Sequence, residues 1–152
     1  MREESLTPQV VAVCTSGGGI PKLPRCSVPV TFSGLASDGH HHDKHNTPLQ
    51  AVSLQDMEVL NDLVKEGFAL QAGATGENLT VRHLKVNSLS VGTILEFSGG
   101  VILELTKIRK PCYVLDVIDP RLKEAIVGRC GFYAKVLQEG VINVCDNILI
   151  SK

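Results

Sequence analysis

The stretch TILEFSGGVILELTKIRKPC, residues 93–112, indicates most directly what fold this chain adopts. Two apolar runs, residues 93–97 and 101–108, flank the short polar sequence Ser98-Gly99-Gly100. This order predicts a β-hairpin. In the second run every odd position from 101 to 105 is apolar and the even positions are mixed, which is typical of a strand with one buried face. A basic pair, a proline and a cysteine follow this strand directly.

The same kind of pattern recurs along most of the chain. Short runs rich in β-branched residues, bounded by glycine, proline or polar residues, predict further strands. Pro29 would confine its strand to a sheet edge or a strand start, because proline has no N–H to donate. Residues 22–26 are assigned to a loop. The further strands are expected at residues 9–15, 28–32, 79–82, 132–137, 141–144 and 147–150.

Two short helices complete the predicted elements. Ser53, with Asp56 three residues later, resembles a capping box at the start of a helix that Gly67 ends. Its apolar face would consist of Met57, Leu60, Leu63 and Val64. A second helix is expected after Asp119-Pro120, since proline is tolerated in the first turn. Many short strands, few helices and no βαβ alternation favour a mainly β, barrel-like domain over a doubly wound fold.

Length and composition narrow the function. A chain of 152 residues suits one domain, here residues 1–152 with a core at about 10–150. Tryptophan is absent, aromatic residues make up 4% and the net charge is −1, so we expect no nucleic-acid surface and no attraction to anionic membranes. No apolar stretch approaches the roughly 20 residues of a membrane span. Without a signal-peptide pattern, a cytoplasmic protein is expected.

Cys112 is the strongest candidate for chemistry. It follows Arg109, Lys110 and Pro111 at the end of a strand, and neighbouring cations favour the thiolate, the form of cysteine that attacks sulfur or binds metal. The alternative is a small buried apolar residue, a common fate of free cysteine. The chain contains no CxxC, so reduced thiols are expected. The remaining cysteines, for which the structural interpretation is favoured, are Cys14, Cys26, Cys130 and Cys145.

The second candidate is the sequence Gly76-Glu77-Asn78, which sits in a glycine-rich turn. An asparagine side chain both donates and accepts hydrogen bonds, which suits the edge of a heterocycle or an oxo group. The alternative is that Glu77 and Asn78 only brace their own turn, as such side chains commonly do.

A polar segment at residues 38–45 contains four histidines. Adjacent histidines on one loop cannot all turn toward a single ion, and the HExxH spacing of many zinc sites is missing. The sequence therefore favours a polar lid, with one or two histidines such as His42 and His45 directed at a ligand, over a zinc or iron site.

Taken together, these motifs resemble the MOSC family, named after the C-terminal domain of molybdenum cofactor sulfurases. The resemblance covers roughly residues 10–150. In the family's order the matching segments are the histidine loop at 39–45, Ala51-Val52-Ser53-Leu54, Gly76-Glu77-Asn78-Leu79-Thr80, Val91-Gly92-Thr93-Ile94-Leu95, Lys110-Pro111-Cys112, and residues 131–137 with Gly140.

The resemblance implies a MOSC-type β-barrel with a few short helices that handles the molybdenum cofactor (molybdopterin) or cysteine-borne sulfur. It implies that Cys112 carries a persulfide or ligates molybdenum. The turn around Glu77 and Asn78 would line the pocket. From their charge, Arg109 and Lys110 would be partners for phosphate or oxo groups.

The resemblance also bears on partners. The sequence shows no aminotransferase-like domain that would bind pyridoxal phosphate and no ferredoxin domain. A persulfide-generating or electron-donor protein is therefore expected, together with proteins of molybdenum cofactor biosynthesis or molybdoenzymes. Two alternatives stay open: a molybdenum-dependent reductase of N-hydroxylated compounds, and a non-catalytic ligand-binding module in which Cys112 is inert.

Overall fold

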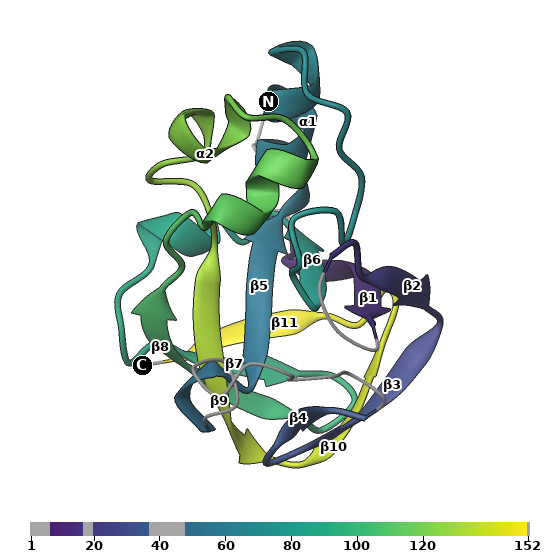
Figure 1. Cartoon of the computed structure of the whole chain (residues 1–152). Helices are drawn as coiled ribbons and strands as arrows, with labels where there is room; N and C mark the ends of the chain where they lie inside the picture. The colour runs from purple at the N-terminus through teal and green to yellow at the C-terminus, as the bar shows by residue number, and fades with distance from the viewer. Residues whose placement is uncertain (1–6, 17–19, 37–47, 152) are drawn as a thin grey trace, which may run out of the picture.

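The computed structural model describes residues 7–16, 20–36 and 48–151, and is mainly β (Figure 1). Its strands are β1 (Gln9–Thr15), β2 (Leu23–Arg25), β3 (Ser27–Thr31), β4 (Gly34–Leu35), β5 (Val52–Asp56), β6 (Leu79–Arg82), β7 (Ile94–Phe97), β8 (Ile102–Ile108), β9 (Phe132–Gln138), β10 (Gly140–Asn143) and β11 (Ile148–Ser151). The helices are α1 (Met57–Lys65) and α2 (Leu122–Ala125), with 3₁₀ helices η2 (Pro48–Gln50), η3 (Val86–Ser88) and η4 (Tyr113–Val117).

The strands form two sheets. The larger has the order β11-β7-β8-β9-β5-β6-β1-β2, and the smaller has the order β10-β3-β4. All pairs are antiparallel except β5 with β6. The predicted hairpin is confirmed, because Leu95 pairs with Leu103 across β7 and β8.

The predicted barrel needs one correction. The mainly β fold with a few short helices is confirmed, but in the described part of the chain no continuous hydrogen-bonded ladder closes the larger sheet. The chain at the start of β1 contacts the chain at the start of β11 at only a few residues. Gln9 and Asn147 form an isolated bridge, and the Ile148 N–H donates to the carbonyl of Pro8 at 2.9 Å.

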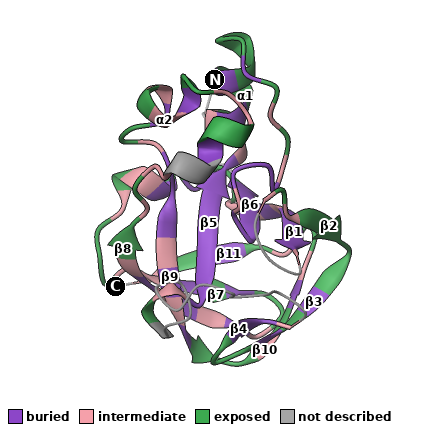
Figure 2. Ribbon diagram, in the orientation of Figure 1, coloured by how far each residue is buried: buried purple, intermediate pink, exposed green. Residues whose placement is uncertain are grey.

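The main core lies inside the sheets, and β5 is buried along its whole length (Figure 2). The alternation at residues 101–105 follows the prediction, since Val101, just before β8, and Leu103 and Leu105 in it are all fully buried. A second apolar cluster packs beneath the helices. It consists of Leu63, Phe68, Leu115, Leu122, Ile126 and Cys130. The candidate cysteine segment connects β8, which contributes Leu103 and Leu105 to the main core, to η4, which contributes Leu115 to the second cluster.

The predicted helix cap at Ser53 is wrong. Strand β5 continues through Asp56, which is the residue before α1 and makes no side-chain cap hydrogen bond. Ser53 instead pairs with Tyr133 of β9. Hydrogen bonds to strands on both sides outweigh the local preference of serine for a helix start.

Two further expectations fail near the N-terminal strand. Residues 23–25, assigned to a loop, form β2 on β1, where Thr15 pairs with Leu23. All three β2 residues are exposed, so no hydrophobic alternation marked the strand. Pro29 lies in β3, between β10 and β4, and not at an edge. The ladder to β4 begins one residue later, at Val30, and so does not need an N–H from Pro29.

Candidate functional site

Cys112 lies where the longest hairpin strand passes into a short helix. The Arg109 N–H donates to the carbonyl of Gly131 at 3.0 Å, which extends the pairing of β8 with β9 by one residue. Cys112 is extended and precedes η4, and its carbonyl accepts the Leu115 N–H at 3.0 Å. The residue is half-buried. Its backbone is therefore fixed on both sides while part of the residue faces solvent.

The Arg109 side chain turns inward beside this segment. Its Nη1 donates to the Cys130 carbonyl at 3.2 Å, and its Nη2 donates to the Thr75 carbonyl at 2.9 Å. The guanidinium also lies over the Tyr133 ring, 5.7 Å from its centroid. Arg109 thus ties the turn at residues 73–78 to the segment that precedes β9.

Arg109 keeps its positive charge in this place. Burial lowers the pKa of the guanidinium, but the nearby Cys130, Tyr133 and Glu77 outweigh burial and raise it overall. The result is a fixed cation within the fold, close to the cysteine segment.

The Glu77 carboxylate is completely buried and serves as the hub of its own turn. It accepts hydrogen bonds from the Gly73 N–H at 2.9 Å, the Thr75 hydroxyl at 2.6 Å and the Thr80 hydroxyl at 2.8 Å. These contacts fit the bracing interpretation. A role of Glu77 in lining a ligand pocket stays a prediction.

Asn78 joins two strands that are far apart in sequence. Its Oδ1 accepts from the backbone N–H and the hydroxyl of Ser53, at 3.0 and 3.2 Å, and its Nδ2 donates to the Cys14 carbonyl at 3.3 Å. Its backbone carbonyl accepts the Cys14 N–H at 2.6 Å. The side chain is 3% exposed, so its polar atoms connect β1 to β5; ligand contact by Asn78 stays a prediction.

The turn also depends on a glycine. Gly76 has a φ of +90°, and a Cβ there would lie 2.9 Å from Cγ2 of Ile20 and 3.7 Å from Nη2 of Arg109. The Ile20 side chain therefore approaches this residue closely, and the Arg109 guanidinium would be in ordinary van der Waals contact with the added Cβ. Glycine adopts this backbone angle without strain and leaves room for Ile20.

The other cysteines differ from Cys112 in their surroundings. Burial, with the nearby Glu77, raises the pKa of the Cys14 thiol to about 12, although Lys22 opposes the shift. Burial also raises the pKa of the Cys130 thiol, against the effect of Arg109 and with a smaller contribution from Cys112. Both buried thiols are therefore protonated near neutral pH, whereas Cys26 and Cys145 are exposed. Cys112, by contrast, is half-exposed.

The structure brings most of the predicted site residues into one region. Arg109 links the Cys112 segment to the Glu77–Asn78 turn, and Lys110 is exposed beside them. His42 and His45 lie outside the described residues. Sequence reasoning missed Thr75, Thr80 and Cys130, which supply the hydroxyl and carbonyl partners in this region. Thr80 belongs to the Gly76–Thr80 motif and Thr75 directly precedes it, whereas no local signal marked Cys130.

No group of three or more His, Cys, Asp or Glu residues in the described part of the chain is arranged to hold a metal ion. Among those same residues, none of the helices has the length and apolar character needed to cross a membrane.

The sequence profile of the MOSC domain matches residues 38–149, which is most of the chain. A protein named "Reductase" from Gibberella moniliformis is 30% identical over 127 residues, covering 78% of this chain and 22% of that protein. The uncharacterized protein YflK of Bacillus subtilis is 32% identical over 83 residues, covering 52% of this chain and 37% of YflK. The chain thus spans less than two fifths of the length of these curated relatives.

Solved structures show the same fold. YiiM from Geobacillus stearothermophilus superimposes with a TM-score of 0.78 at 26% sequence identity, covering 95% of this chain and 75% of YiiM. The YUAD protein of Bacillus subtilis has a TM-score of 0.80 at 16% identity, covering 95% and 96% of the two chains. At that identity, the second similarity supports the fold alone.

Proposed function

This chain belongs to the MOSC domain family, and we propose that it acts through Cys112 in molybdenum cofactor chemistry, carrying sulfur or ligating molybdenum during cofactor maturation or delivery. One observation carries the proposal. Cys112 is half-exposed and follows the buried cation Arg109 by three residues in the sequence, whereas burial raises the pKa of Cys14 and Cys130. Of these three thiols, Cys112 is the one that a ligand or partner can reach.

The residues present suit the molybdenum cofactor by the chemistry of their donors. A thiolate is a soft ligand for a transition metal, and Cys112 would supply it. The exposed Lys110 ammonium would bind a phosphate as a point charge. Arg109 would add positive charge from within the fold, since its Nη1 and Nη2 donate to backbone carbonyls. The cofactor, when bound, would supply the redox chemistry.

As a sulfur carrier, Cys112 would react by thiol exchange with a persulfide on a partner protein. The Cys112 thiolate attacks the terminal sulfur, the sulfur–sulfur bond of the donor breaks, and the donor cysteine leaves as a thiolate. The product is a persulfide on Cys112, and no external oxidant is required. The partner would be a persulfide-generating protein, and the recipient would be a molybdenum cofactor biosynthesis protein or a molybdoenzyme.

A second candidate function is a domain of a molybdenum-dependent reductase of N-hydroxylated compounds. The relative from Gibberella moniliformis that bears the name "Reductase" favours it. This function also uses Cys112, together with electrons from a separate donor. Reduction of an N-hydroxylated base by the cofactor-loaded protein and a chemical electron donor would distinguish it from sulfur carriage.

The test is metal and pterin analysis of protein produced in a host that makes the molybdenum cofactor. We expect molybdenum and pterin with the wild-type protein, and loss of both in Cys112→Ser. Cys26→Ser removes an exposed thiol elsewhere and should retain both. If the wild type binds neither, mass spectrometry of Cys112 after incubation with a persulfide donor tests the carrier role. Equal retention of cofactor and sulfur by wild type and Cys112→Ser would contradict the proposal.

A further inference from the structure

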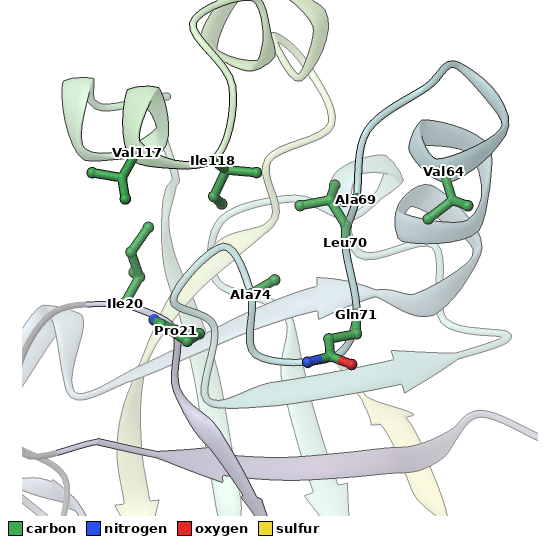
Figure 3. A pocket seen from close by; sticks show the side chains of 9 residues that line it. All are labelled: Ile20, Pro21, Val64, Ala69, Leu70, Gln71, Ala74, Val117 and Ile118. Carbon is green, nitrogen blue, oxygen red and sulfur yellow. The ribbon is translucent and has the colours of Figure 1, made fainter.

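A pocket of about 600 Å³ opens beside the candidate site (Figure 3). All of its described lining residues are apolar except Gln71, whose amide is the one side-chain hydrogen-bonding group among them. The walls come from three separate parts of the chain. Val117 and Ile118 lie at the end of η4, Ile20 precedes β2, and Ala74 belongs to the segment that leads into the Gly76 turn.

These walls are shared with the candidate site. Helix η4 begins directly after Cys112, so the same short helix connects the cysteine to Val117. Ile20 closes on Gly76, where a Cβ would lie 2.9 Å from its Cγ2 atom. Ala74 precedes Thr75, whose carbonyl accepts the hydrogen bond from Arg109. The pocket is therefore connected to the cysteine segment through η4 and through the turn that Arg109 contacts.

The rim of the pocket leaves apolar side chains in water. Val117 is 85% exposed and Val64 is 46% exposed, and Figure 3 shows both at the pocket. Covering such surface contributes roughly 25 cal/mol per Å². A concave apolar surface of this kind, with one polar group to orient an occupant, is typical of small-molecule sites.

We propose that this pocket binds an uncharged small molecule with an aliphatic or aromatic body, oriented by a hydrogen bond to the amide of Gln71. Among the described residues, no charged side chain lines the pocket, and an unpaired charge is costly to bury. The described lining therefore offers no charged partner to a phosphate-bearing pterin. The pocket is thus a second site, beside the place proposed for the cofactor. Its volume lies within the range of roughly 300–1,000 Å³ usual for small-molecule pockets.

The test uses N-phenyl-1-naphthylamine, an uncharged fluorescent probe. We expect saturable binding to the wild-type chain at one site. Ala69→Phe should weaken it, because Ala69 is an exposed lining residue and a phenyl group there would occupy part of the pocket without disturbing the core. Val117→Asp, which places a carboxylate at the rim, should weaken binding about tenfold. Circular dichroism establishes that each variant is folded.

Two control variants show whether the probe occupies this pocket and whether its binding depends on Cys112. Val127→Asp introduces the same charge at another exposed valine, one that does not line the pocket, and should leave binding unchanged. Cys112→Ser should bind the probe like the wild type, so the result is independent of the proposed function. The proposal is overturned if the wild-type chain shows no saturable binding of the probe, or if Val117→Asp and Val127→Asp lose binding equally. It is also overturned if sedimentation velocity shows that self-association of the chain displaces the probe, because the surface would then contact a second copy.

Discussion

The turn at Glu77 and Asn78 and the segment at Cys112 are the two motifs that attracted attention in the sequence, yet they differ in structure. The turn is closed, because Glu77 accepts three hydrogen bonds and Asn78 connects two strands, and both side chains are buried. Cys112 is half-exposed on a backbone fixed by its neighbours. A motif can therefore contain framework residues and a reactive residue, and burial with bonded partners distinguishes them.

The largest effect is expected from Glu77→Ala. It leaves one amide and two hydroxyl donors without their acceptor inside the fold. Buried donors without partners should lower the free energy of unfolding by about 3–5 kcal/mol. Urea denaturation measures the change, with the exposed residue Glu124→Ala as the control. If Glu77→Ala is too unstable to study, Glu77→Gln should give an intermediate loss. If Glu77→Ala is as stable as Glu124→Ala, the hydrogen bonds of Glu77 do not stabilise the fold.

The pH dependence of Asp56 comes next and extends the comparison to another buried acid. Burial raises the pKa of Asp56 to about 6, together with Glu58 and against the hydrogen bonds from Val86 and Lys85. Its ionisation therefore destabilises the folded protein above about pH 6, by about 2–3 kcal/mol at 1.36 kcal/mol per pKa unit. This penalty falls as the pH drops from about 6 toward 4.

Asp56→Asn removes that titration and keeps an oxygen for the Val86 N–H. The difference in free energy of unfolding, variant minus wild type, should therefore be more positive at pH 7 than at pH 5. Urea denaturation of both proteins across this range measures the difference. A constant difference between the two proteins would show that the carboxyl of Asp56 does not titrate there.

Glycine at position 76 gives the next comparison. Gly76→Ala introduces both an unfavourable positive φ and a Cβ 2.9 Å from Ile20. Gly92→Ala has a similar φ, of +95°, but nothing within 4 Å of the new Cβ. Backbone strain should cost both about 1–2 kcal/mol, and the close contact should add about 1–3 kcal/mol for Gly76→Ala. Thermal unfolding of the two variants separates these effects, and equal losses would show that Ile20 moves aside freely.

The smallest effect on stability is expected at Cys112, where the effect on function should be greatest. Cys112→Ser should change the free energy of unfolding by less than about 1 kcal/mol, because the residue is half-exposed. Cys130→Ser buries a hydroxyl and should cost about 1–3 kcal/mol. The effect on retention of sulfur or cofactor should be the opposite: Cys112→Ser should lose it and Cys130→Ser should keep it. The distinction between framework and reactive cysteine fails if both variants behave alike in both measurements.

Much of the fold could be predicted because it depends on local pattern. Alternation of apolar residues gave the buried face of β8, and the glycine-containing turn gave its hairpin with β7. The failures have a common cause. Ser53 was assigned to a helix cap and residues 23–25 to a loop, but pairing with strands distant in sequence determined both.

The candidate site divides in the same way. By itself, the sequence determined most of the strands, the motifs of the MOSC family and Cys112 as the residue to test, since periodicity and motif spacing are properties of neighbouring residues. Only the tertiary structure decided that Asn78 bonds to Ser53 and Cys14, and that Arg109 bonds to the carbonyls of Thr75 and Cys130. Those partners lie 21 to 64 residues away. The fold of the whole chain brings them within hydrogen-bonding distance, and no pattern among neighbouring residues predicts these contacts.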